Sequence, residues 1–192
     1  QADARWKLVQ KIQRAMPATA TGKKIALLER VTRADAAALF IEELKVDALY
    51  DRLLRKTGDA ALRGGKTPGD AAGRAAAVDI TDHPLRADIE GVLRVGMRGL
   101  ELFPDGTFRP AEQVDRASYA MMIEDMLLRL TGDGGLATRF IGSRSPFPDL
   151  GPDAPWFNAV MVVTSRGLME PGDTRTGAFA PRQPVAGVDA LL

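Results

Sequence analysis

The chain has 192 residues, of which 45% are hydrophobic and 27% are charged, which is typical of a globular protein with a substantial core. The formal net charge of +1 gives no general field that would favour nucleic acid or an anionic membrane. The absence of cysteine excludes disulfides, thiol catalysis and cysteine-ligated metal, and no apolar run approaches the roughly 20 residues that a membrane helix needs.

The first predicted elements are two helices. Apolar side chains recur at three- and four-residue spacing over residues 4–16, which indicates a helix with one apolar face. Pro17 ends that helix, and residues 24–30 are expected to be extended or irregular. Thr32 is a favourable N-cap and Asp35 follows three residues later, so a second helix is predicted to begin at Thr32 with nearly a capping box.

Residues 57–76 separate these helices from the rest of the chain. Gly, Ala, Pro, Arg and Asp dominate this stretch, and no helical or strand periodicity continues through it. We therefore predict a long mobile loop or linker, a solvated insertion without a function of its own.

Two more helices are predicted after the linker. Residues 83–95 carry a helical apolar pattern that Gly96 would end. The Pro-Asp-Gly-Thr run at residues 104–107 is typical of a tight turn. Asp115 is a good cap for a strongly apolar helix that continues to Leu130.

A final pair of helices is predicted near the end of the chain. Residues 147–150 precede a helix that ends at Gly167, and another helix begins at Val185. The apolar pattern still continues at residues 191–192, and no signal peptide is visible at Gln1. We therefore expect the chain to be a processed or trimmed piece of a longer protein.

One segment occurs twice with a constant offset. Five pairs of apolar, glycine and proline residues differ by 71 positions, which indicates an architecture built from copies of one unit. These pairs are Ile89/Val160, Gly96/Gly167, Phe108/Phe179, Pro110/Pro181 and Val114/Val185.

A third copy lies at the start of the chain. Val31-Thr32-Arg33-Ala34 aligns with Val114-Asp115-Arg116-Ala117 at an offset of 83, and the excess over 71 falls within the linker. The sequence therefore predicts three units, each a helix, a turn-bearing connection and a second helix. The predicted bounds are 1–56 for a degenerate first unit, 57–76 for the linker, 77–135 for the second unit, and 136–192 for a third unit that is expected to be truncated.

These motifs resemble the S-layer homology (SLH) family. The family's unit opens with aromatic-x-Asp and a first helix, and continues with Asp-Gly-Thr-Phe-x-Pro and a Thr-Arg-Ala-Glu motif at the second helix. Residues 105–110 match the Asp-Gly-Thr-Phe-x-Pro motif in full, and residues 32–35 match the arginine motif with Asp in place of Glu. The resemblance covers about the whole chain.

The resemblance implies a mainly α fold, in which three helix-loop-helix repeats with short extended segments form a pseudo-threefold bundle. It also implies a non-catalytic module of the bacterial cell envelope, in the periplasm or at the cell surface. Such a module binds cell-wall polysaccharide or peptidoglycan in grooves between repeats. No cofactor, no nucleic acid and no membrane insertion of this segment are expected.

Arg33 and Arg116 are the leading candidates for ligand binding. A guanidinium can donate two hydrogen bonds to a carboxylate, such as a pyruvyl or uronic group. Each arginine lies in the first turn of a predicted helix, where free backbone N–H groups favour an anion. The alternative is that each arginine binds backbone carbonyls of a neighbouring unit and holds the three units together.

Three further residues match the family's polar and aromatic positions. Asp79 and Asp149 match the opening aspartate, and are expected either to accept hydrogen bonds from sugar hydroxyls or to cap a helix or turn. Trp156 is expected either to stack on a sugar ring or to pack at a core or junction. His83 is the only histidine and has no companion for a metal site or a catalytic triad, so no metal ligand or catalytic residue is predicted.

The third unit departs from the family pattern. It has Val185-Ala186-Gly187-Val188 where the other units have arginine, so at most two grooves keep the cation that an anionic polymer needs. The residues that pack helices together match the family pattern better than the polar residues do. This asymmetry motivates an alternative function, a structural subunit that docks protein partners in a bacterial envelope complex.

Overall fold

The structure is a computed structural model that describes residues 2–57 and 77–192, so the predicted linker lies outside the described residues except for Thr57. Within this part of the chain the fold is mainly α, as expected, with eight α-helices and isolated β-bridges in place of a sheet. The elements are α1 (Ala2–Ala15), α2 (Ala20–Ile25), α3 (Arg33–Ala38), the π-helical η1 (Leu39–Glu43), α4 (Val46–Thr57), α5 (Arg86–Val95), α6 (Arg116–Thr131), the 3-10 helix η4 (Gly134–Thr138), α7 (Phe157–Ser165) and α8 (Gly187–Leu191).

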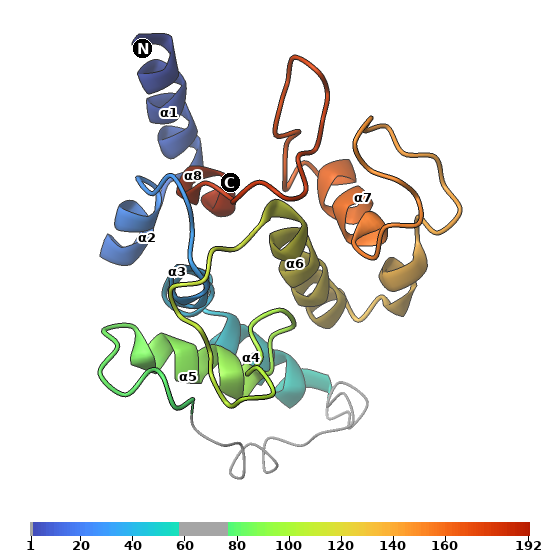
Figure 1. Ribbon diagram of the computed structural model, residues 1–192. Helices are drawn as coiled ribbons and strands as arrows, with labels where there is room; N and C mark the ends of the chain where they lie inside the picture. The colour runs from blue at the N-terminus through green and yellow to red at the C-terminus, as the bar shows by residue number, and fades with distance from the viewer. Residues whose placement is uncertain (1, 58–76) are drawn as a thin grey trace.

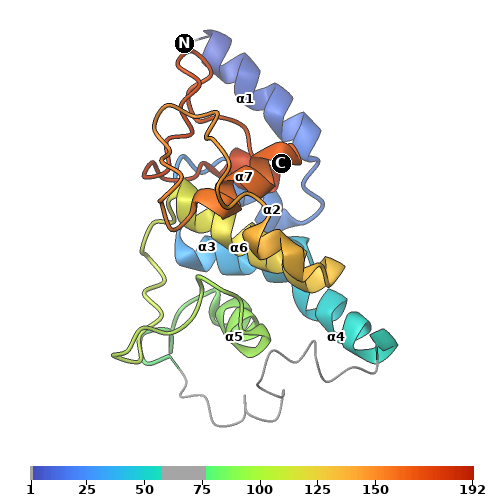
Figure 2. The ribbon, with the colours of Figure 1, turned by 90° about the vertical axis from the view of Figure 1, so that its right-hand side faces the viewer.

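Helix α6 lies in the middle of the molecule. Figure 1 shows α7 on one side of α6 and the group of α3, α4 and α5 on the other. Helix α6 packs against α7, and α3 packs against α5. Helix α1 extends away from this body, and α8 contacts it near the base of α1 (Figures 1 and 2). The first and last helices of the chain therefore pack against each other.

The core is a continuous cluster of buried apolar side chains drawn from most of the described elements. Phe40 of η1 stacks on Tyr119 of α6, with ring centroids 6.0 Å apart. The hydroxyl of Tyr119 donates to the carbonyl of Ala190 at 2.6 Å, which ties α6 to α8. Burial of each such large side chain stabilises the fold by roughly 1.5–3 kcal/mol.

Three valines form a closed ring of backbone hydrogen bonds inside this core. The N–H of Val31 donates to Val185, that of Val185 donates to Val114, and that of Val114 donates to Val31, each over 2.9 Å. All three side chains are buried. These are the residues that the repeat alignment sets at equivalent positions.

The predicted helix starts at Thr32 and Asp115 are confirmed. The Thr32 side chain accepts from the N–H of Asp35, whose carboxylate accepts from the N–H of Thr32, so the capping box is complete. The Asp115 carboxylate accepts from the N–H of Ser118 at 2.7 Å. Gly96 ends α5 with a φ of 69°, a left-handed conformation that glycine adopts without steric cost.

The region around α2 differs from the prediction. Helix α2 includes residues 24 and 25, which were expected to be extended or irregular. Thr19 caps its first turn, and the carboxylate of Glu43 accepts the N–H groups of Ala18 and Thr19. Glu43 is the last residue of the π-helical segment that follows α3. A contact between residues about 25 positions apart therefore stabilises a helix that its own sequence does not predict.

Helix α5 begins at Arg86, later than the apolar pattern predicts. The preceding residues form turns, in which Nδ1 of His83 accepts a hydrogen bond from the N–H of Leu85 at 3.1 Å. The single histidine therefore acts in a local turn.

Buried polar groups join α6 to α7. The side chain of Asn158 donates to the carboxylate of Glu124 and to the carbonyl of Leu136, and accepts from the N–H of Phe140. Burial raises the pKa of Glu124, and the hydrogen bond from Asn158 opposes this rise. This network holds the start of α7 against α6 and η4.

Candidate functional site

Arg33 binds backbone carbonyls through each of its three guanidinium nitrogens. Nε donates to Phe108 at 2.8 Å, Nη1 to Gly99 at 2.7 Å, and Nη2 to Glu101 at 2.8 Å. The guanidinium also lies over the rings of Phe103 and Phe108, 4.9 and 4.7 Å from their centroids. Burial lowers the pKa of Arg33. Arg33 therefore holds the connection at residues 99–108 against α3.

Arg116 has the equivalent place in α6 but makes one carbonyl contact fewer. Its Nε donates to the carbonyl of Phe179 at 2.9 Å, and its Nη2 donates to the carbonyl of Glu170. No carbonyl in the described part of the chain accepts from Nη1, which lies 3.9 Å from the carboxylate of Asp189. Burial lowers the pKa of Arg116, and Asp189 opposes this effect. One edge of Arg116 is thus directed at a side chain rather than at the backbone.

Gly187 stands where the third unit would have its arginine. Its N–H donates to the carbonyl of Leu28 at 2.9 Å. A Cβ atom at this position would lie only 1.7 Å from the carbonyl oxygen of Ile25. The end of α2 and the residues after it therefore occupy the space that a side chain would need.

Asp79 and Asp149 each hold a loop through two backbone N–H groups, over distances of 2.7–2.8 Å. One residue of each loop has a left-handed φ, 56° at Arg109 and 58° at Ala180. Residues other than glycine rarely adopt this conformation. Burial opposes ionisation of Asp79, but the N–H groups of Phe108 and Arg109 outweigh it and lower its pKa. The donors are Phe108 and Arg109 for Asp79, and Phe179 and Ala180 for Asp149.

We predict that Asp79→Asn lowers the free energy of unfolding by about 1–2 kcal/mol, because the amide replaces one of two charged acceptors with a donor. The pKa of Asp79 is lower in the folded than in the unfolded protein, so its contribution is present at neutral pH. That contribution is lost as the pH falls through the folded-state pKa. Urea unfolding at pH 7 and at low pH measures both effects.

Asp82→Asn is the matched control, because Asp82 is exposed and lies three residues after Asp79. Its substitution is expected to leave unfolding nearly unchanged at both pH values. Equal effects of the two substitutions would contradict the role given to Asp79.

Trp156 lies immediately before α7 and is half-buried against the core. The guanidinium of Arg182 lies 4.3 Å from the centroid of its ring. The indole N–H has no acceptor within the described residues. One face of the ring is therefore covered by a cation of the same chain.

A groove of about 370 Å³ lies where α1, α6, α8 and the connection after α7 come together. Arg116 lines it, whereas the other four predicted site residues do not. Its lining consists of residues 167–172 together with Lys11, Arg14, Arg116, Thr174, Asp189 and Leu192.

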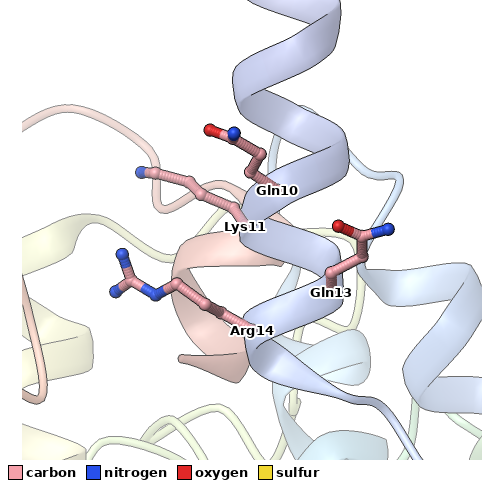
Figure 3. A pocket seen from close by; sticks show the side chains of 4 residues that line it. All are labelled: Gln10, Lys11, Gln13 and Arg14. Atoms are coloured by element: carbon pink, nitrogen blue, oxygen red, sulfur yellow. The ribbon is translucent and has the colours of Figure 1, made fainter.

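Two side chains of α1 reach across to this groove. Nζ of Lys11 lies 2.6 Å from Asp189 and 3.9 Å from Glu170, and Nη2 of Arg14 lies 3.1 Å from Glu170. Figure 3 shows that Lys11 and Arg14 extend to the same side of α1 as Gln10. A shallow hollow of about 510 Å³ beside α1 shares Lys11 and Arg14 with the groove. The groove therefore contains cations and carboxylates from both ends of the chain.

The described residues bring no group of three or more His, Asp or Glu side chains together in a way that could hold a metal ion. No helix over residues 2–57 and 77–192 is both long enough and apolar enough to cross a membrane.

Comparison with protein families matches residues 100–120 and 146–185 to the S-layer homology domain. These two segments of the chain are therefore similar to the S-layer homology domain. No curated protein and no solved structure shows a significant match to the chain. S-layer homology domains are non-catalytic modules that anchor proteins to cell-wall polysaccharide, so the expected non-enzymatic class and the cell-envelope location are confirmed.

The S-layer homology segments supply only part of the groove. They contain Arg116 and residues 167–172, whereas α1 and α8 lie outside the matched residues. Sequence reasoning missed Lys11, Arg14, Glu170 and Asp189, because the charges that pair across the groove lie more than 150 positions apart. The one local signal is the three-residue spacing that sets Lys11 and Arg14 on one face of α1.

Proposed function

We propose that this S-layer homology protein attaches non-covalently to the cell wall by binding an acidic glycan in the groove beside α1. The observation that carries this proposal is the Nη1 edge of Arg116 at the groove lining, which faces the carboxylate of Asp189 and has no carbonyl acceptor among the described residues. Two carbonyls hold the rest of the guanidinium, so a ligand carboxylate would meet a donor that is already oriented.

Part of the proposal is that the three units surround a pseudo-threefold centre, with the bounds predicted from the repeats. The ring of Val31, Val114 and Val185 supports it. Equivalent backbone bonds at two junctions also support it: Arg33 and Arg116 donate to Glu112 and Gln183, and Ala34 and Ala117 donate to Pro110 and Pro181. Left-handed glycines recur at matching positions, namely Gly96/Gly167 and Gly106/Gly177.

The three junctions of this arrangement are chemically unequal, which favours one binding groove in each chain. At the first junction the donors of Arg33 are held by three carbonyls, and at the third Gly187 is closed in by residues 25–28. In this proposal Arg33, Asp79 and Asp149 support ligand binding indirectly, by fixing the connections between helices.

We predict that Thr174→Glu weakens binding to purified sacculi roughly tenfold, because it adds a negative charge to the lining of a groove that would receive an anion. Thr174 is exposed, so the thermal unfolding midpoint should stay unchanged. Sedimentation of the purified protein with sacculi that retain their accessory polysaccharide measures the affinity.

Thr138→Glu is the matched control, since Thr138 is also exposed and lies in η4, away from the groove lining. It should bind sacculi like the unaltered protein. Absence of binding by the unaltered protein, or equal binding by both variants, would reject glycan anchoring through this groove.

Docking of an envelope protein is the second candidate function. Three large apolar side chains of α1 and of the residue after it, Trp6, Val9 and Met16, are exposed. An exposed apolar stripe on a projecting helix is typical of a protein-binding surface. Co-purification from native envelopes tests this function: a Trp6→Ser, Val9→Ser variant should lose a partner that the unaltered chain retains. A chain that purifies alone would count against docking.

A further inference from the structure

Five of the side chains that line the groove beside α1 are charged, and these charges already pair with one another. Lys11, Arg14 and Arg116 supply three positive charges, while Glu170 and Asp189 supply two negative charges, which leaves a net charge of +1. Asp189 lies between two cations, 2.6 Å from Lys11 and 3.9 Å from Arg116. Glu170 likewise lies 3.1 Å from Arg14 and 3.9 Å from Lys11. Each carboxylate therefore holds a position that a ligand's acid group would need.

The side chains of these ion pairs are more exposed to solvent than the side chain of Arg116. The side chains of Asp189, Lys11, Glu170 and Arg14 are 27%, 34%, 45% and 62% exposed, whereas that of Arg116 is 5% exposed. Exposed pairs of this kind are weak and exchange readily with other ions. The buried guanidinium of Arg116 is held by two backbone carbonyls, so displacement of the carboxylates would leave it in place.

The geometry points to a competitive latch: α1 closes the groove through Lys11 and Arg14, and an acidic glycan binds by displacing the carboxylates of Asp189 and Glu170 from the same three cations. This inference rests on the proposed glycan binding and adds its regulation. It assigns Lys11 and Arg14, which lie outside the S-layer homology segments, to the binding of the ligand's acid groups. It also makes Asp189 and Glu170 determinants of affinity.

Charge-neutralising variants test the latch, because competition and simple structural pairing predict opposite changes. Asp189→Asn and Glu170→Gln remove the internal competitors, so each should raise the affinity for polysaccharide-bearing sacculi roughly threefold or more. The double variant Lys11→Gln, Arg14→Gln should lower it by a similar factor. If the pairs were only structural, all of these variants would lower or preserve the affinity as they loosen α1.

The controls remove equivalent ion pairs elsewhere on the surface. Glu90→Gln breaks the pair with Arg86 at 2.7 Å, and Asp133→Asn breaks the pair with Arg139 at 2.8 Å. Neither residue lines the groove, so both variants should bind sacculi like the unaltered protein. Thermal unfolding of every variant shows whether its fold is retained.

The possible outcomes separate this inference from the function on which it rests. If the unaltered protein binds and Thr174→Glu weakens binding, but Asp189→Asn and Glu170→Gln do not strengthen it, the latch is overturned and glycan anchoring stands. If the unaltered protein does not bind sacculi, both are overturned. Stronger binding by Asp189→Asn and Glu170→Gln, weaker binding by the lysine–arginine double variant and unchanged controls support the latch.

Discussion

Replacing Gly187 with alanine is expected to destabilise the protein by about 3 kcal/mol or more, because the structure has no room for a side chain there. The added Cβ would lie 1.7 Å from the carbonyl oxygen of Ile25, a backbone atom that cannot move without its helix. Separation of the two segments would also break the bond from the N–H of Gly187 to Leu28. Urea unfolding, followed by circular dichroism, measures the loss.

Gly134→Ala is the matched control for this substitution. An added Cβ at Gly134 would have no neighbour within 4 Å, and the backbone there is not left-handed. We expect a change in unfolding free energy within about 0.5 kcal/mol, as for most surface substitutions. Equal stability of the Gly187→Ala protein and the unaltered protein would show that the third junction is open, and would remove the reason for a single groove.

Arg33→Ala is expected to cost about 3–5 kcal/mol of stability, since it removes a buried cation that binds three carbonyl oxygens. The connection at residues 99–108 would lose its attachment to α3, and the rings of Phe103 and Phe108 would lose the cation above them. Arg33→Lys should recover part of the loss, because one ammonium cannot reproduce the planar fork of a guanidinium. Thermal and urea unfolding measure both variants.

Arg30→Ala provides the comparison, because Arg30 is exposed and makes one long contact to Gln113 at 3.5 Å. Its effect on stability should be small. A stable Arg33→Ala protein that has lost its binding to sacculi would reverse our view of the two arginines, since it would make Arg33 rather than Arg116 the cation that meets the ligand.

Features that depend on neighbours in the sequence were predicted well. The capping box at Thr32, the cap at Asp115 and the helix end at Gly96 each involve residues within about four positions of one another. The S-layer homology family was also recognised from the sequence, because the motif at residues 105–110 lies within a matched segment. Such local motifs can be recognised without knowledge of the rest of the fold.

Features that depend on distant contacts were missed. Helix α2 is held at its start by Glu43, and the start of α5 is shifted by turns around His83. The roles of the two arginines could not be separated either, since both have the same local sequence setting. What distinguishes them is the carbonyl that Nη1 of Arg33 meets at Gly99 and the carboxylate that Nη1 of Arg116 faces at Asp189.

The sequence by itself determined the resemblance to the S-layer homology family, most helices and the alignment of Val31, Val114 and Val185, because caps, turns and apolar periodicity act over a few residues. Only the tertiary structure decided where the groove lies and which charges meet in it. Lys11 and Asp189 are 178 positions apart, and their 2.6 Å contact exists only because α1 packs against α8. Pairing over such a separation depends on how the whole chain packs, which no local pattern encodes.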